Sequence, residues 1–143
     1  MPARLIIAER NGQWAPLLRA ALGEGGPRLH ESGTIEAAWR MLDEFPASFL
    51  IVELTHRNAS ALVDRVFPLA RTHPRARVAL LADRAMAGYA GLMLEAGAVA
   101  FACNPRRLAP LAEVARRHLA TVPPEPPAAP VERIWAELPW HPL

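Results

Sequence analysis

Residues 77–105 read RVALLADRAMAGYAGLMLEAGAVAFACNP, and this stretch contains two short apolar runs separated by a helical pattern. The runs are Arg77–Ala82 and Val99–Cys103, and both are continuous where a strand with one solvated face would alternate. Between them, Ala85–Ala96 follows Asp83 as a capping residue and is followed by a glycine, as helices commonly are. The stretch therefore predicts a β-α-β unit of a parallel sheet.

The same alternation extends over the residues that precede and follow this unit. Three more apolar runs predict strands at Arg4–Glu9, Arg28–Glu31 and Phe49–Leu54. Helical patterns lie between the runs, at Gln13–Leu22, Ile35–Phe45 behind Thr34 as N-cap, Ser60–Thr72 and Arg106–Ala120. The order βαβαβαβαβα implies an α/β fold with a five-stranded parallel sheet between helices. Proteins with such a sheet bind their ligands at the carboxyl ends of the strands.

Composition restricts the class of protein. The chain has 143 residues, 52% of them hydrophobic, which suits one domain with one core. All 16 basic residues are arginine, and with 14 acidic residues the net charge is only +2, which favours neither nucleic acid nor an anionic membrane. The absence of lysine excludes lysine-based catalysis. A single cysteine and an apolar run too short for a signal peptide or membrane span favour a cytoplasmic protein.

The C-terminal part of the sequence differs from the rest. Residues 122–130 read VPPEPPAAP, which favours an extended proline-rich linker, so we place the α/β domain at residues 1–121. Residues 131–143 form a short tryptophan-containing amphipathic tail, whose binding residues we expect to be Ile134, Trp135, Leu138 and Trp140. Such large apolar side chains have to dock, either on the same chain or on a partner, and we expect a partner or a second copy.

The stretch LEAGAVAFACNP, together with the five-fold alternation, resembles the receiver domain of bacterial two-component response regulators over about residues 3–120. The resemblance implies a flavodoxin-like fold with strand order 2-1-3-4-5. It places Phe101 at the aromatic switch position of the fifth strand, and Asn104 and Pro105 where the family has a Lys-Pro pair.

The resemblance also implies where a phosphoacceptor pocket should lie, and this chain departs from the family there. Glu53 occupies the position of the phosphoacceptor aspartate, Glu9 and Arg10 replace the acidic pair that holds magnesium, and Ala82 replaces a hydroxyl residue. The positive charge of Arg10 opposes a metal ion, and the longer Glu53 side chain displaces any acyl phosphate. We therefore expect a degenerate pocket without cofactor or metal, made of Glu9, Arg10, Glu53, Ala82, Asn104 and Pro105.

Several polar residues have two interpretations. Arg10 either forks onto Glu53 or Glu9 and locks the pocket, or remains solvated. Cys103 is interpreted as a small buried hydrophobe and not as a nucleophile activated by His56 or His118. The arginines of the last predicted helix are expected to form an ordinary solvated face.

The functional prediction is a non-catalytic pseudo-receiver, a phosphorylation-independent interaction or adaptor module in bacterial signalling, and not an enzyme. As the family resemblance implies, the fourth helix, fifth strand and fifth helix would bind a protein partner or a second copy of the chain. Two alternatives remain: a phosphorelay regulator with Glu53 as an atypical acceptor, and a small-ligand sensor that uses the emptied pocket.

Overall fold

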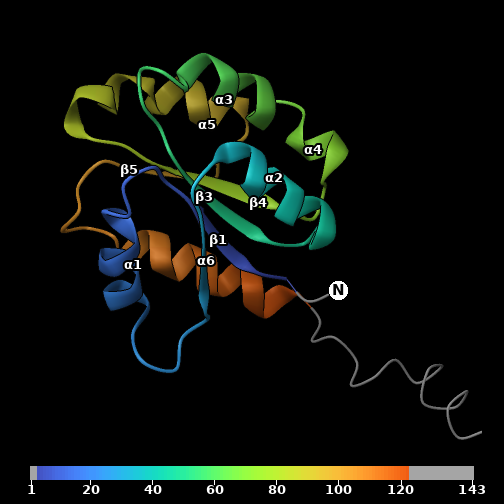
Figure 1. The fold of residues 1–143 in the computed structure, drawn as a ribbon, viewed down its shortest axis with the longest axis vertical. Helices are drawn as coiled ribbons and strands as arrows, with labels where there is room; N and C mark the ends of the chain where they lie inside the picture. The colour runs from blue at the N-terminus through green and yellow to red at the C-terminus, as the bar shows by residue number, and fades with distance from the viewer. Residues whose placement is uncertain (1–2, 123–143) are drawn as a thin grey trace, which may run out of the picture.

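The computed structural model describes residues 3–122 and contains a five-stranded parallel sheet in the order β2-β1-β3-β4-β5 (Figure 1). The strands are β1 (Leu5–Ala8), β2 (Leu29–Ser32), β3 (Phe49–Glu53), β4 (Arg77–Leu81) and β5 (Ala100–Ala102). The predicted fold class and strand order are confirmed. Because consecutive strands are parallel, their carboxyl ends lie at one edge of the sheet.

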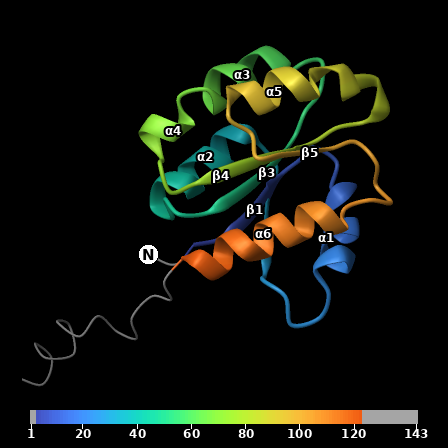
Figure 2. The same cartoon turned by 180° about the vertical axis from the view of Figure 1, so that it is seen from behind.

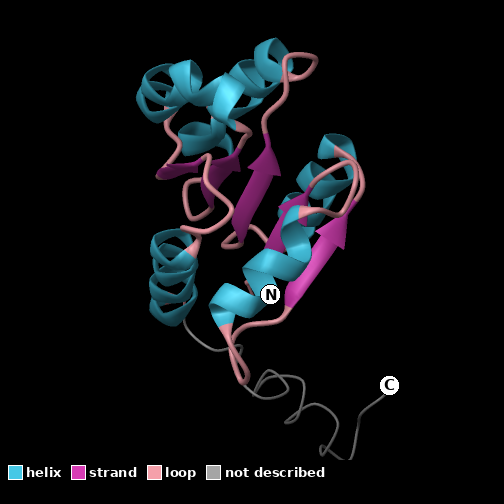
Figure 3. Cartoon of the chain, turned by 90° about the vertical axis from the view of Figure 1, so that its left-hand side faces the viewer, coloured by secondary structure: helices cyan, strands magenta, loops and turns pink. Residues whose placement is uncertain are grey.

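Helices cover both faces of this sheet (Figures 2 and 3). One face carries α1 (Trp14–Leu22) and α6 (Ala109–Thr121), and the other carries α2 (Ile35–Glu44), α3 (Ala59–Val66) and α5 (Ala90–Ala96). Two shorter elements join them, α4 (Leu69–Thr72) and the 3₁₀ helix η1 (Arg84–Tyr89). Within the described residues no helix is both long and apolar enough to cross a membrane.

The central strands are buried on both faces. Leu50 and Val52 pack toward α2, α3 and α5, whereas Phe49 and Ile51 pack toward α1 and α6. These β3 side chains are fully buried. Successive residues of the strand are therefore all apolar, which explains why the sequence shows continuous runs instead of alternation.

Two of the predicted helices are interrupted. The helix expected at Ser60–Thr72 is split, so that prediction is wrong in its middle. The Phe67 N–H makes the last bond of α3, to Val63 O (3.0 Å), and Pro68 has no N–H with which to continue. Its carbonyl instead accepts from Arg71 and Thr72 and begins α4. The helix expected at Ala85–Ala96 likewise begins as the 3₁₀ helix η1.

The last helix also begins later than the predicted Arg106. Asn104 Oδ1 accepts from Arg106 N (3.0 Å) and Asn104 O accepts from Arg107 N (3.0 Å), so these residues form a turn before α6. The predicted helix boundaries at Thr34 and Gly97 are confirmed: Thr34 Oγ1 accepts from Ala37 N (3.1 Å), and Gly97 ends α5 with a φ of +125°.

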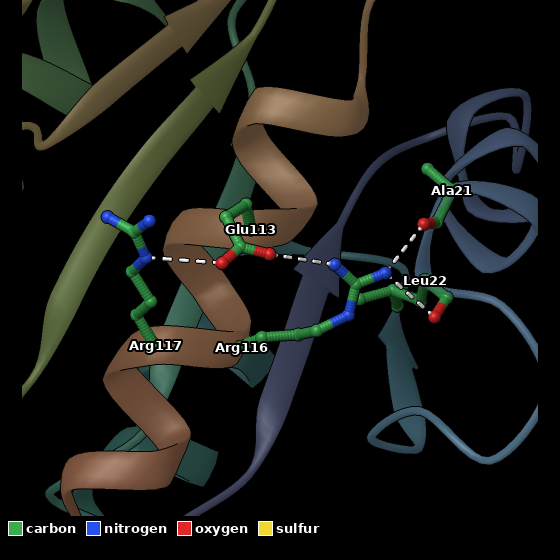
Figure 4. Close-up of polar contacts among 5 residues, drawn as sticks. All are labelled: Ala21, Leu22, Glu113, Arg116 and Arg117. Carbon is green, nitrogen blue, oxygen red and sulfur yellow. Dashed lines mark hydrogen bonds and ion pairs between the residues drawn. The ribbon is translucent and has the colours of Figure 1, made fainter.

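The expectation of an ordinary solvated face on the last helix is wrong for Arg116 (Figure 4). Its Nη2 donates to the carbonyl oxygens of Ala21 and Leu22, both at 2.9 Å, at the end of α1. Its Nη1 donates to Glu113 Oε2 (3.1 Å), whose other oxygen accepts from Arg117 Nε (3.1 Å). Arg116 thus joins α6 to α1, whereas Arg117 stays on the exposed side of the helix.

The expected tail residues Ile134, Trp135, Leu138 and Trp140 lie outside the described residues.

Candidate functional site

A cavity of about 710 Å³ opens at the carboxyl ends of β1 and β3. Its walls come from the ends of these strands, the start of α2 and the loop between β3 and α3. The polar and charged side chains that line it include Glu9, Arg10, Glu36, Glu53, His56, Arg57, Asn58 and Asp83. The structure therefore brings together Glu9, Arg10 and Glu53 of the predicted pocket, and the cavity mixes both signs of charge.

Glu9 is the most buried charged residue of this cavity, with 7% of its surface exposed. Its Oε1 accepts from Trp14 N (2.8 Å) and its Oε2 accepts from Ala15 N (2.7 Å). Both oxygens therefore bind the first turn of α1, whose residue at the N-cap position, Gln13, makes no side-chain capping bond. Glu9 therefore acts as the cap of α1 from the preceding loop.

Arg10 and Glu53 are in contact, but not through the guanidinium. The backbone N–H of Arg10 donates to Glu53 Oε1 at 3.4 Å. Within residues 3–122, no ion pair joins the Arg10 side chain to Glu53 or Glu9. The structure therefore does not contain the locked charge pair that was one interpretation of these residues, and Arg10 is exposed.

Asn58 holds the loop that follows β3, and the sequence analysis did not identify it. Its Nδ2 donates to Glu53 O (2.8 Å), its Oδ1 accepts from Thr55 N (2.7 Å), and its backbone N–H donates to Thr55 Oγ1 (3.2 Å). The spacing Thr-x-x-Asn after a strand was the available signal, since both side chains commonly bond to nearby backbone. These bonds fix the backbone at Glu53 on the cavity wall.

The other residues of the predicted pocket, Ala82, Asn104 and Pro105, are not among those that line this cavity. Ala82 is fully buried and its N–H donates to Ala102 O (2.9 Å). The Asn104 side chain is used in its own turn, and Pro105 is exposed. Phe101, at the expected switch position, is half-buried and packs against the core on the α2, α3 and α5 face.

The residues present do not fit the magnesium site that the receiver fold implies. Both oxygens of Glu9 already accept hydrogen bonds from backbone N–H groups, and Arg10 places a cation beside it in the sequence. Among the described residues, no group of three or more His, Cys, Asp or Glu is arranged to hold a metal ion. Magnesium prefers near-octahedral oxygen ligands, which this set does not offer.

Cys103 is not paired with either histidine that the sequence suggested. It is half-buried and lines a separate cavity of about 390 Å³ with Trp14 and Asp83. The His118 Nε2 donates to Ala47 O (2.7 Å), just before β3 begins, and so lies at the opposite edge of the sheet. The exposed His56 packs edge-on against Tyr89, with ring centroids 6.4 Å apart.

Comparison with known proteins gives a fold but no close relative. No protein-family model and no curated protein matches the chain. Among solved structures, a response regulator from Thermotoga maritima is 16% identical with a TM-score of 0.68, over 85% of this chain and 100% of that one. The fold is that of a receiver domain. A CheY-like protein (tadZ) from Pseudomonas aeruginosa is 20% identical with a TM-score of 0.63, over 89% and 100% of the two chains.

A protein from Burkholderia thailandensis that is provisionally assigned to pilus assembly (cpaE) is also similar. It is 20% identical with a TM-score of 0.59, over 85% of this chain and 100% of that one. These identities are low, so the three likenesses establish the shared receiver fold and leave the function to the residues of the site.

Proposed function

We propose that this chain is a cytoplasmic protein-interaction module with a receiver fold, and that it acts without phosphoryl transfer at its own pocket. The observation that carries the proposal is the state of Glu9, whose two oxygens cap α1. A receiver needs carboxylates at this position to hold a metal ion, and a carboxylate that accepts two short bonds from a helix N-terminus is poorly placed for that task.

The other groups of the pocket support the same proposal. Phosphoryl transfer depends on preorganised cations around the phosphoryl oxygens, and the chain has no lysine. The Asn104 side chain, which replaces that lysine, bonds to Arg106 N. Ala82 offers only a buried methyl group where a hydroxyl would respond to the phosphate.

The proposed binding surface consists of α5, β5 and α6. Leu92 and Leu94 of α5 are 49% and 47% exposed, on either side of the buried Met93. β5 is the last strand of the sheet and has no partner on its outer side within residues 3–122, and its three residues are half-buried. The likeness to a protein provisionally assigned to pilus assembly favours an interaction role, because assembly requires proteins to bind one another.

The test replaces the exposed leucines of this surface with aspartate, as Leu92→Asp with Leu94→Asp. The matched control is Leu17→Asp, because Leu17 is 43% exposed on α1, which is not part of the proposed surface. Affinity capture from the source organism and sedimentation of the purified chain are compared for the three proteins. We expect the double variant to lose a protein or a self-association that wild type and control retain, at an unchanged melting temperature. Equal binding by all three proteins would contradict the proposed surface.

The cavity itself favours a second candidate function, the sensing of a small ligand. A volume of about 710 Å³ is within the usual range of small-molecule sites, and Arg57 and Asn58 offer donors on its wall. Melting curves with a metabolite panel test this function. A stabilising compound whose effect is lost in Arg57→Gln would favour it over the interaction module.

A further inference from the structure

An apolar cleft lies at the opposite edge of the sheet from the cavity of about 710 Å³, between α3, α4 and α5. It has a volume of about 250 Å³, and Val66, Leu69, Pro74 and Val99 are among its lining residues. Phe67, which follows Val66 in the chain, is 69% exposed. An open apolar cleft beside an exposed phenylalanine is typical of a docking site for an apolar side chain.

Basic residues outnumber acidic ones in and next to this cleft, with Arg71, Arg75 and Arg77 against Glu95, which precedes the lining residue Ala96. Arg77 lines it, and Arg71 and Arg75 are exposed on the α4 helix and the loop between α4 and β4. None of the three takes part in an ion pair within residues 3–122. Arg77 Nη1 donates to the carbonyl oxygens of Pro74 (3.0 Å) and Ala76 (2.8 Å), so no carboxylate of residues 3–122 neutralises its charge.

The described chain ends at the same edge of the sheet. The last turns of α6 lie beside Ala47, which His118 contacts just before β3 begins, and Arg77 begins the neighbouring strand β4. In Figures 1 and 2, α4 and the end of α6 lie toward the same side of the molecule. Whatever follows residue 122 therefore starts on the side where the cleft opens.

We infer that this cleft is the docking site of residues 131–143 of the same chain, with Trp135 as the side chain that enters it. The proline-rich residues 122–130 span about 28 Å when extended, at about 3.1 Å per residue, which is enough to pass around the edge of a sheet covered on both faces. Residues 123–143 contain three glutamates and one arginine, which complements the excess of basic residues at the cleft.

Docking in this way has a functional consequence. Trp135, Ile134 and Leu138 share one stripe of the sequence-predicted helix, so the surface that enters the cleft is also the surface that a partner would bind. A protein that recognises the tail must then compete with the cleft, and the tail is sheltered until such a protein is present. This inference does not rest on the proposed α5, β5 and α6 surface.

Hydrogen–deuterium exchange of the full-length chain at low micromolar concentration tests the inference. We compare wild type with Trp135→Ala and with Ala70→Asp, which puts a carboxylate into the cleft at an exposed position. In both variants we expect the amides of residues 66–70 and 96–99 to exchange about five-fold faster, because the cleft is open to solvent. The amides of α1 and β2, on the far side of the molecule, serve as the internal control.

Three outcomes would overturn the inference. Equal exchange of the cleft amides in all three proteins would show that the tail does not cover them. Protection that grows with protein concentration would assign the cleft to a second copy of the chain. If the amides of α6, and not those of the cleft, exchange more slowly in wild type than in Trp135→Ala, the tail docks on α6. If Trp135→Ala lowers the melting temperature, the comparison of wild type with Ala70→Asp still decides the question.

Discussion

At the scale of single residues, Glu9 has the sequence position of a metal-binding carboxylate but a different structural role. It ends the first apolar run, where the resemblance to receivers places a metal-binding carboxylate, and the structure uses both of its oxygens to cap α1. A carboxylate at a helix N-terminus satisfies N–H groups that have no partner within the helix and interacts favourably with the helix dipole. Glu9 thus contributes to the stability of the domain.

Replacement of Glu9 by alanine is expected to lower the free energy of unfolding by about 2 kcal/mol, because two N–H groups of α1 lose charge-assisted bonds in a buried place. Glu9→Gln should cost less, since one oxygen still accepts. Urea denaturation measures both changes. Glu36→Gln, at an exposed position on the same cavity, is the control and should change stability little. If Glu9→Ala is as stable as wild type, Glu9 does not stabilise the domain by capping α1.

His30 makes stability depend on pH. Burial, and then the charges of Arg4 and Arg28, hold the pKa of His30 below its usual value of 6.5. The unfolded chain therefore binds this proton more readily than the folded one, so the free energy of unfolding should fall as the pH is lowered from about 6.5 toward the depressed pKa. Above that window His30 is neutral in both states and has no effect.

Melting curves at a series of pH values test this for wild type and His30→Gln. We expect the variant to lose part of the acid destabilisation, whereas His56→Gln, at an exposed position, keeps it. Identical slopes for wild type and His30→Gln below pH 6.5 would refute the role of His30.

The residues of the site were only partly predictable for a physical reason. A resemblance places Glu53, Ala82 and Asn104 by their order along the strands, which sheet topology fixes. It does not reveal which hydrogen bonds a side chain forms with a loop, so neither the capping bonds of Glu9 nor the loop bonds of Asn58 followed from the sequence. The contact between Arg10 and Glu53 depends on a backbone N–H, which no side-chain pattern reports.

At the scale of elements, the domain depends on contacts between helices that are distant in sequence. Arg116 of α6 donates to two carbonyl oxygens at the end of α1, where the helix leaves its last acceptors without partners. A cation at this position also interacts favourably with the negative end of the α1 dipole.

Arg116→Ala is expected to lower the free energy of unfolding by about 1 to 2 kcal/mol, because the hydrogen bonds to the carbonyl oxygens of Ala21 and Leu22 are lost. The neighbouring Arg117 provides the matched control. Its side chain is 79% exposed and, among the residues drawn in Figure 4, contacts only Glu113. Arg117→Ala should therefore lower the free energy of unfolding by less than about 0.5 kcal/mol. Chemical denaturation compares the two variants. Equal losses would mean that the exposed ion pair, and not the bond to α1, stabilises the helix.

The elements themselves were predictable to the extent that apolar periodicity decides them. Four of the five strands contain continuous apolar runs, as strands covered on both faces do, whereas β2, with the sequence LHES, was found mainly from its place in the alternation. The break at Pro68 was missed because the apolar spacing continues through it, although the missing N–H ends α3. Similarly, the apolar pattern of residues 85–96 does not distinguish a 3₁₀ turn from an α-helical one.

At the scale of the whole molecule, the receiver fold and the chemistry of receivers are separable. The sheet order follows from apolar runs and right-handed crossovers, which many sequences satisfy, whereas phosphoryl transfer needs particular charges at the strand ends. In this chain the strand ends carry a helix cap, a buried methyl group and a turn-forming amide. We therefore propose that this chain acts through the surfaces of its domain.

We propose that the pocket does not take a phosphoryl group, and intact-mass measurement after incubation with acetyl phosphate and magnesium shows whether it does. A receiver domain known to accept phosphate from acetyl phosphate is the positive control. We predict that the wild-type chain gains no phosphoryl group under conditions that modify the control, and that Glu53→Gln behaves identically. A phosphoryl adduct on the wild-type chain that disappears in Glu53→Gln would show that the pocket accepts a phosphoryl group after all.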